Sequence, residues 1–417
     1  MKEKDEVVID TEYFNDISQS YLKNLKENVG NYKIKIEVLS QNETVIGEII
    51  RDISASTQGQ INVNYQQLTR RSFNLTLTNR EKLYNPSPNN FFWIDRKIKL
   101  WTGIELGDST YWFSQGVFYS NAANTDSHTV NIEGIDKGGA LDGTLKRNRL
   151  SQKVIIKAGS KVSDVFKETL LESDGLGMID PIEPMIDSYF DTVFLQADIE
   201  VDEGDYIGTL FVEIATNYGA DVYYDNDGRL RVEKNPEIMG RDKYNYKGIA
   251  YNFSNETPYY EGANLTYNYE CYNSVTVFTN INAKDSDGNQ IENVSYTAYN
   301  KNPQSPLNIS SIGIRQMDSI EIKYINGVTS AEMTELCKQN ATYHLLKQSL
   351  QKMSLSFSSI PILHLNVDDV VTITDEYKDL QMEKFVISSL TIPLSGETMS
   401  VSAANISYLP YDREVEW

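Results

Sequence analysis

The chain has 417 residues, and 59 acidic against 38 basic side chains give it a formal net charge of −21. Its hydrophobic content of 40% is enough to build packed cores, which excludes wholesale disorder. The acidic balance argues against a broad nucleic-acid-binding surface, because such surfaces neutralise phosphates with Lys and Arg. At roughly 100–200 residues per domain, the length predicts two to four domains.

The sequence has no apolar run long enough for a transmembrane helix, so we expect no stable membrane insertion. It opens with MKEKDEVVID, which lacks the apolar region of a signal peptide. Cys271 and Cys337 are the two cysteines of the sequence. This number excludes a disulfide framework and a cysteine-based zinc cluster.

The first part of the chain predicts a helix followed by strands. Apolar residues at helical spacing indicate a short N-terminal helix or arm within 1–30, ending near Gly30. From residue 31, short alternating stretches separated by polar turns follow one another, as in NYKIKIEVLS. Period-2 alternation is typical of half-buried strands. The region 31–140 is therefore predicted to form a first β-barrel or sandwich.

The pattern changes over 141–240, where helical periodicity returns. A helix is predicted at about 207–218, with Gly219 at the position of a C-terminal cap. The stretch DVYYDNDGRLRVEK that follows reads as a hairpin around an Asn-Asp-Gly turn. We therefore expect a small, acidic α+β insertion domain here.

The last part, 241–417, is predicted to form a second β-barrel. A polar stretch at 282–308 reads as a long loop. Thr329 and Glu332 fit a capping box, which predicts a helix over 331–350 packed on this barrel. Four strand-like stretches follow. The fold class is therefore mainly β with an α+β insertion, with two β-barrels or sandwiches flanking a small α+β domain.

Residues that could carry chemistry do not form a known motif. His128, His344 and His364 lie in three different predicted elements and lack the spacing of a zinc hydrolase. No nucleophile elbow, P-loop or dinucleotide fingerprint is present. Cys337 lies among apolar residues of the predicted helix and is interpreted as a small core residue, as is Cys271 in its strand-like stretch. We predict no catalytic residue and no cofactor.

The stretch 168–228 contains no Lys, Arg or His and carries sixteen acids. Three interpretations stay open: a solvated acidic face, a site for a divalent cation, or the paired carboxylates of a glycosidase. Two Asp-Gly segments, at 225–228 and 285–289, are interpreted as hairpin turns rather than calcium loops. The acids are Glu168, Glu172, Asp174, Asp180, Glu183, Asp187, Asp191, Asp198, Glu200, Asp202, Glu203, Asp205, Glu213, Asp221, Asp225 and Asp227.

Three stretches resemble the hub proteins of phage tail tips and baseplates. In 112–136, Gly116, Phe118 and Asp136 stand where such hubs carry a G-x-F strand and the aspartate that leads into an insertion. The stretch 209–234 is similar to the helix, glycine and hairpin of the small α+β domain of hubs.

The third stretch, 361–406, resembles the last strands of hubs, which follow a G-D-V-V motif. Asp368 replaces the glycine of that motif, and Asp tolerates the left-handed conformation that the turn requires. Together the stretches span about 30–410. Hubs that carry a lytic or receptor-binding extension continue beyond this point, and the sequence stops soon after it.

The resemblance implies a non-enzymatic structural protein. Its two barrels would be tube-like, and a homotrimer would form a pseudo-sixfold ring that matches the tail tube and lets DNA pass. The implied partners are the tail tube or distal tail protein, the tape-measure protein, and a tip spike, fibre or lysin. No sequence-specific nucleic-acid binding is implied. Like charge on the lumen would prevent phosphates from binding. The implied location is the virion, after assembly in the host cytoplasm, with a role in host cell entry.

Two alternatives remain beside the hub. One is a tail-associated cell-wall hydrolase that uses carboxylates of the acidic insertion. The other is a carbohydrate-binding receptor protein, favoured by 27 Tyr and 4 Trp, since aromatic faces stack on sugars. The aromatic residues are dispersed through predicted strands, where core packing explains them.

Overall fold

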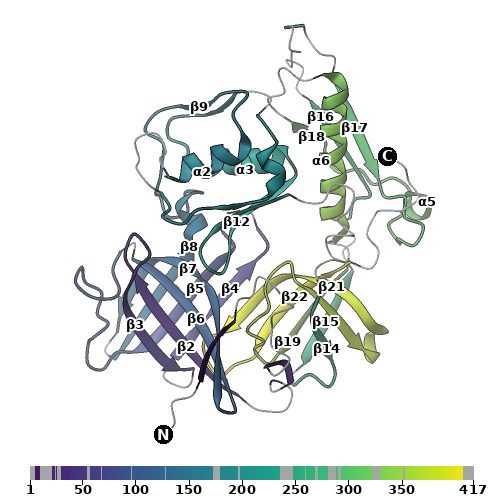
Figure 1. The fold of residues 1–417 in the computed structure, drawn as a ribbon. Coiled ribbons are helices and arrows are strands. Elements are labelled where there is room, and N and C mark those ends of the chain that lie inside the picture. The colour runs from purple at the N-terminus through teal and green to yellow at the C-terminus, as the bar shows by residue number, and fades with distance from the viewer. Residues whose placement is uncertain are drawn as a thin grey trace.

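The structure is a computed structural model. It describes residues 5–9, 21–23, 25, 30–53, 57–66, 68–94, 96–126, 128–171, 179–195, 198–234, 248–258, 260–267, 271–279, 288–289, 293–322, 329–350 and 353–406. Two β-barrels lie side by side, and each has an α+β unit on the same side of it (Figure 1). No described helix combines the length and the apolar character that crossing a membrane requires.

Strands of both barrels belong to one 14-stranded sheet. The first barrel contains β2 (Asn31–Leu39), β3 (Val45–Asp52), β4 (Thr57–Asn64), β5 (Arg71–Thr78), β6 (Lys97–Leu106), β7 (Ser109–Thr125) and β8 (Thr129–Asp136). The second contains β14 (Ile249–Ser254), β15 (Glu261–Tyr267), β19 (Met353–Ser359), β20 (Val370–Asp375), β21 (Leu380–Pro393) and β22 (Met399–Asn405). The expected mainly β fold with two barrels is confirmed.

The barrels are joined because β21 of the second pairs antiparallel with β4 of the first, with Leu390 opposite Val63. Alternation explains the strands: in β5, Phe73, Leu75 and Leu77 are buried while the residues between them are not. Burying every second residue places one face of the sheet on the core. A single hydrophobic cluster contains residues of both barrels. The barrels therefore share one continuous interior.

The expected insertion follows β8. It contains α2 (Val162–Leu171), α3 (Ile207–Asn217), the three-stranded sheet β10 (Met185–Ile186), β13 (Leu230–Lys234), β12 (Ala220–Tyr224), and the pair β9 (Val154–Ile156), β11 (Ile199–Val201). Its core is separate, with the rings of Phe166 and Phe211 5.0 Å apart. Gly219 ends α3 with φ +59°, and Gly228 closes the hairpin with φ +77°. Both predicted glycine positions are confirmed.

A second α+β unit lies between β15 and β19. It contains β16 (Ser274–Thr279), β17 (Ser295–Tyr299), β18 (Ile320–Ile322), α5 (Ile309–Ile312) and α6 (Ser330–Leu350). The capping box before α6 is confirmed: Thr329 N–H donates to Glu332 Oε2 at 2.8 Å, and Glu332 N–H to Thr329 Oγ1 at 3.3 Å.

Here the structure differs from the sequence-based expectation. The α6 helix packs mainly on β16 and β17, where Cys337 and Leu345 lie in one cluster with Val275 and Val277. It also contacts the second barrel, as expected, because Leu346 packs with Val370 and Val386. The expected long loop at 282–308 contains β17, whose weak alternation buries Ala298 alone. Such a short strand gains its stability from the helix that covers it, a contact that sequence pattern does not show. The division of the chain at residues 30, 140 and 240 stays a prediction.

The N-terminal arm begins with a strand. β1 (Asp5–Ile9) pairs in parallel with the first half of β7. Tyr13, Phe14 and Ile17 of the expected helix lie outside the described residues, whereas Tyr21 is helical and fully buried. The β-branched residues of β1 favour an extended conformation, and β7 offers them a strand edge to pair with, which explains why this segment forms a strand.

Candidate functional site: the polar face of the joined sheet

The three histidines do not come together. His128 is exposed beside the β7–β8 turn. His344 lies on α6, where burial lowers its pKa to about 4. His364 is buried between the barrels, and burial lowers its pKa to about 4 as well. Among the described residues, no three His, Cys, Asp or Glu side chains could hold a metal ion.

Both cysteines are buried. Burial raises the pKa of the Cys337 thiol to about 11, so the thiolate that a nucleophile needs is disfavoured. This position agrees with its interpretation as a small core residue.

Many acids of the stretch 168–228 are held in ion pairs rather than forming a purely solvated face. Four exposed pairs link them to lysines that precede the stretch: Lys153–Glu200 at 2.5 Å, Lys157–Asp198 at 2.7 Å, Lys161–Asp191 at 3.5 Å and Lys167–Glu183 at 3.6 Å. Glu172 and Asp174 lie outside the described residues. The cations come from outside the stretch, which explains why its local composition looked unbalanced.

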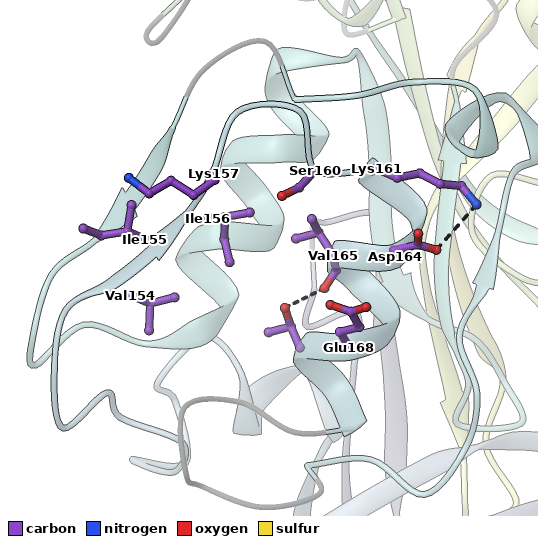
Figure 2. Close-up of a pocket in the computed structure, with 10 residues that line it drawn as sticks. Val154, Ile155, Ile156, Lys157, Ser160, Lys161, Asp164, Val165 and Glu168 are labelled. Atoms are coloured by element: carbon purple, nitrogen blue, oxygen red, sulfur yellow. Dashed lines mark hydrogen bonds and ion pairs between the residues drawn. The ribbon is translucent and has the colours of Figure 1, made fainter.

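A pocket of about 540 Å³ opens beside this acidic region, between β9 and α2 (Figure 2). Lys157 and Lys161 line it, and Val165 and Glu168 lie on the helix side. Both lysines are already engaged by carboxylates, Lys157 by Asp198 and Lys161 by Asp164 at 3.5 Å. The pocket thus has an apolar wall on the strand side, and both of its lysines are paired with carboxylates.

Buried charges fasten the insertion to the first barrel. Lys137, just after β8, donates from Nζ to Asp180 Oδ1 at 2.7 Å, to Glu43 Oε1 at 2.6 Å and to the Gly228 carbonyl at 2.7 Å. The side chains of Lys137 and Asp180 are 2% and 1% exposed. Removing one partner from such a cluster leaves an uncompensated buried charge, so these contacts fix the relative position of the two units.

One carboxylate joins three parts of the molecule. Asp221 on β12 accepts a hydrogen bond from Tyr65, which follows β4. Its other oxygen lies 3.2 Å from the Tyr343 hydroxyl and 3.5 Å from Lys347 Nζ, both on α6. The first barrel, the insertion and the second α+β unit therefore meet at this one buried side chain.

The face of the joined sheet that points away from the core extends across both barrels, and we call it the polar face. Its residues lie opposite one another across eight paired strands and are all half-buried or exposed. They include two carboxylates, Glu133 and Glu261, and no Lys or Arg. The residues are Glu261, Asn264, Thr266, Ser354, Ser356, Ser358, Ser400, Ser402, Ser389, Thr391, Gln60, Asn62, Asn64, Ser72, Asn74, Thr76, Thr129, Asn131, Glu133, Ala122 and Asn124.

Hydrogen bonds run across this face. Thr391 Oγ1 donates to Asn62 Oδ1 at 3.3 Å across the junction of the barrels, and Thr76 Oγ1 donates to Asn131 Oδ1 at 2.7 Å. The sequence alone does not show that these residues form one face. A signal was present, since serine occupies every second position in 354–358 and again in 400–402.

The fold matches solved phage tail proteins over nearly the whole chain. The 43 kDa tail protein of prophage MuSo2 from Shewanella oneidensis is 13% identical at a TM-score of 0.53, and the match covers 90% of this chain and 98% of that one. A tail protein from Neisseria meningitidis MC58 is 11% identical at a TM-score of 0.54, covering 91% and 98%. The chain has the fold of a phage tail protein.

The fold also matches a chain of a larger complex. A chain of a PdpA–VgrG complex is 12% identical at a TM-score of 0.50, and the match covers 93% of this chain and 67% of that one. No protein-family model matches the sequence. No curated protein matches it either. The resemblance seen in sequence stretches therefore holds at the level of the fold.

Residues that carried the resemblance have clear places in the tail-protein fold. Phe118 is fully buried, with its ring 5.0 Å from that of Phe73. Asp136 Oδ2 accepts the N–H groups of Arg70 and Arg71 at 2.8 and 2.7 Å. Asp368 has φ +70°, the left-handed conformation expected where it replaces glycine.

Proposed function

We propose that the protein is a structural, non-enzymatic hub of a phage tail tip or baseplate, in which three copies form a ring around a passage for DNA. The observation that carries this proposal is the polar face, which continues across both barrels without a single Lys or Arg. Hydroxyl and amide groups keep such a surface wet, while the absence of cations leaves nothing to neutralise phosphates. DNA could therefore move along it without being retained.

Two unpaired strand edges support a ring. β15 has a partner strand on one side, and the end of β7 extends beyond its pairing with β6, so each leaves an edge without a partner strand among the described residues. Exposed edges promote association with another chain, and closing the sheet into a ring removes them. A ring of three two-barrel chains presents six barrels, which suits a sixfold tube.

The arrangement of the units suggests the partners. Both α+β units lie on one side of the two barrels (Figure 1). We propose that the barrels stack on the tail tube or distal tail protein, with the tape-measure protein in the passage. The tip spike, fibre or lysin would bind at the ring, within the virion, after assembly in the host cytoplasm.

A hydrolase has less support from the geometry. Asp180 and Asp221, the most buried acids of the stretch 168–228, are held by lysines and tyrosines. Paired catalytic carboxylates need a cleft between them. The structure gives no specific support for a glycan-binding receptor protein either, because most of the large aromatic side chains pack in the core rather than on the surface.

Light scattering on purified protein over a range of concentrations tests the hub. We expect a trimer of the 47.4 kDa chain, alone or on addition of the tube protein, and ring-shaped particles by electron microscopy. A monomer under all these conditions would contradict the proposal. Release of soluble fragments from purified cell walls would instead favour the hydrolase.

A further inference from the structure

The strand order of the joined sheet contains the same unit twice. The order β15-β19-β22-β21 is followed directly by β4-β5-β8-β7, and every neighbouring pair in it is antiparallel. In each unit the chain runs through the first two strands of the unit before it reaches the last two. The two barrels thus contribute equivalent four-strand repeats to the polar face.

A β-bulge fixes how the repeats align. The pairing of β7 with β8 shifts between Ser120 and Ala122, and that of β21 with β22 shifts between Ile387 and Ser389. Aligning the two bulges makes Ala122 equivalent to Ser389. The same alignment superposes two fully buried phenylalanines, Phe118 and Phe385, a coincidence that supports it.

Within one chain, the two repeats are joined by a pair of neighbouring strands. β21 pairs with β4 so that Thr391 lies opposite Asn62. By the bulge alignment, Thr391 is equivalent to Asn124 on β7. Asn62 lies opposite Ser72 in one repeat, and Thr266 lies opposite Ser354 in the other. The strand pairing across each repeat therefore makes Asn62 equivalent to Thr266.

The equivalent positions at the outer ends of the two repeats, Asn124 and Thr266, lie on strand edges that have no partner strand among the described residues. β6 pairs with β7 as far as Tyr119, and 121–125 extend beyond it, half-buried or exposed. β15 pairs with β19 on one side and has no strand on the other among the described residues. Each edge thus lacks the neighbour that its internal equivalent has.

Charge separates these two edges from the edge strand β3. β3 carries Glu48, Arg51 and Asp52 among its exposed residues, and charges on an edge prevent unwanted pairing. The end of β7 has no charged residue over 121–125, and β15 has one, Glu261. The two edges with few charges, the end of β7 and β15, are therefore the same two edges that the alignment of the repeats places opposite each other.

We infer that neighbouring copies of this chain join by antiparallel pairing of the end of β7 with β15, with Asn124 opposite Thr266 of the next copy. This inference rests on the proposed hub and adds the subunit interface and its register. The new junction repeats the internal one between β21 and β4, so the polar face continues around the ring.

Paired cysteines and a short thiol-specific crosslinker test the register. Directly opposed residues on antiparallel strands have Cβ atoms about 4.5–5.5 Å apart. The variant Asn124→Cys/Thr266→Cys should shift from the monomer band to a covalent trimer. Asn62→Cys/Thr391→Cys is the matched control at the internal junction, where the link forms within one chain and the mass stays that of the monomer.

A variant one residue out of register, Asn124→Cys/Leu265→Cys, places the thiols on opposite faces and should remain uncrosslinked. Light scattering on each variant separates the outcomes. A trimer in which the first pair does not crosslink, or crosslinks no better than the shifted pair, overturns the register and leaves the hub standing. A monomer that crosslinks at the internal pair overturns the hub, and the inference with it.

Discussion

His364 shows how a single side chain ties the barrels to the N-terminal arm. Its Nε2 lies 3.1 Å from the Ala250 carbonyl, and its Nδ1 lies 3.4 Å from the Tyr21 hydroxyl. The rings of Tyr21 and Phe113 pack around it. Burial lowers the pKa of this imidazole to about 4, against an ordinary 6.5, so the folded protein holds it neutral. The unfolded chain binds a proton there first, and acid therefore favours unfolding.

His364→Gln should weaken the dependence of stability on pH. Between pH 7.5 and pH 5 the wild type should lose about 2 kcal/mol through this group alone, because its folded pKa lies below its unfolded pKa. Denaturant unfolding at several pH values measures the slope, and the Gln variant should lack that part of it. His128→Gln, at an exposed position, is the control for loss of a histidine. Parallel pH curves for the wild type and His364→Gln would contradict the assignment.

At the scale of elements, α6 depends on its first turn. Reciprocal hydrogen bonds between Thr329 and Glu332 satisfy backbone N–H groups at the start of the helix, which have no partner within the helix itself. The same helix covers the short sheet of β16, β17 and β18 and reaches Asp221 at the junction of three units. Fraying of α6 would therefore loosen both the sheet and the junction.

Thr329→Ala should destabilise the second α+β unit by about 1 kcal/mol, the usual cost of removing a helix cap. Hydrogen exchange of the amides in α6 and β16 measures the loss. Thr334→Ala is the matched control, because Thr334 Oγ1 bonds the Ser330 carbonyl within the helix and caps no free N–H. Equal effects of the two substitutions would show that the capping box contributes nothing specific.

The sequence predicted elements with strong local signals. The capping box, Gly219 and the left-handed Asp368 follow from the backbone conformations that those residues favour. It did not predict the second α+β unit, because β17 is stabilised by α6 rather than by its own alternation. The polar face was missed for a similar reason. Its serines and amides are informative once β21 is known to pair with β4, which is a contact between distant parts of the chain.

At the scale of the whole molecule, the polar face carries only a small part of the net charge of −21. The stretch 168–228 carries sixteen acids and no Lys, Arg or His, while the polar face exposes hydroxyl and amide groups with two carboxylates. In the proposed hub, the lack of Lys and Arg on the polar face, more than the acidity of the whole chain, would let DNA pass without being retained.

Adding cations to the wall should convert it into a DNA-binding surface. Asn74 and Ser356 occupy equivalent positions in the two repeats, so Asn74→Lys/Ser356→Lys places lysines all around the proposed ring. The double variant should retain DNA at low salt and release it as salt rises. Ser151→Lys/Ser310→Lys adds the same charge at exposed positions on the α+β units. Electrophoretic mobility of DNA compares them, and equal retention by both variants would refute a special role of the polar face.

The covalent link between the repeats has a consequence for assembly. The junction of β21 with β4 forms as the chain folds, whatever the protein concentration. A tethered partner acts as if it were present at an effective concentration of about millimolar. Half of the junctions in a ring are thereby complete before two molecules meet, and the other half alone respond to dilution. Such a ring should form from scarce protein early in particle construction, when six separate repeats would still be apart.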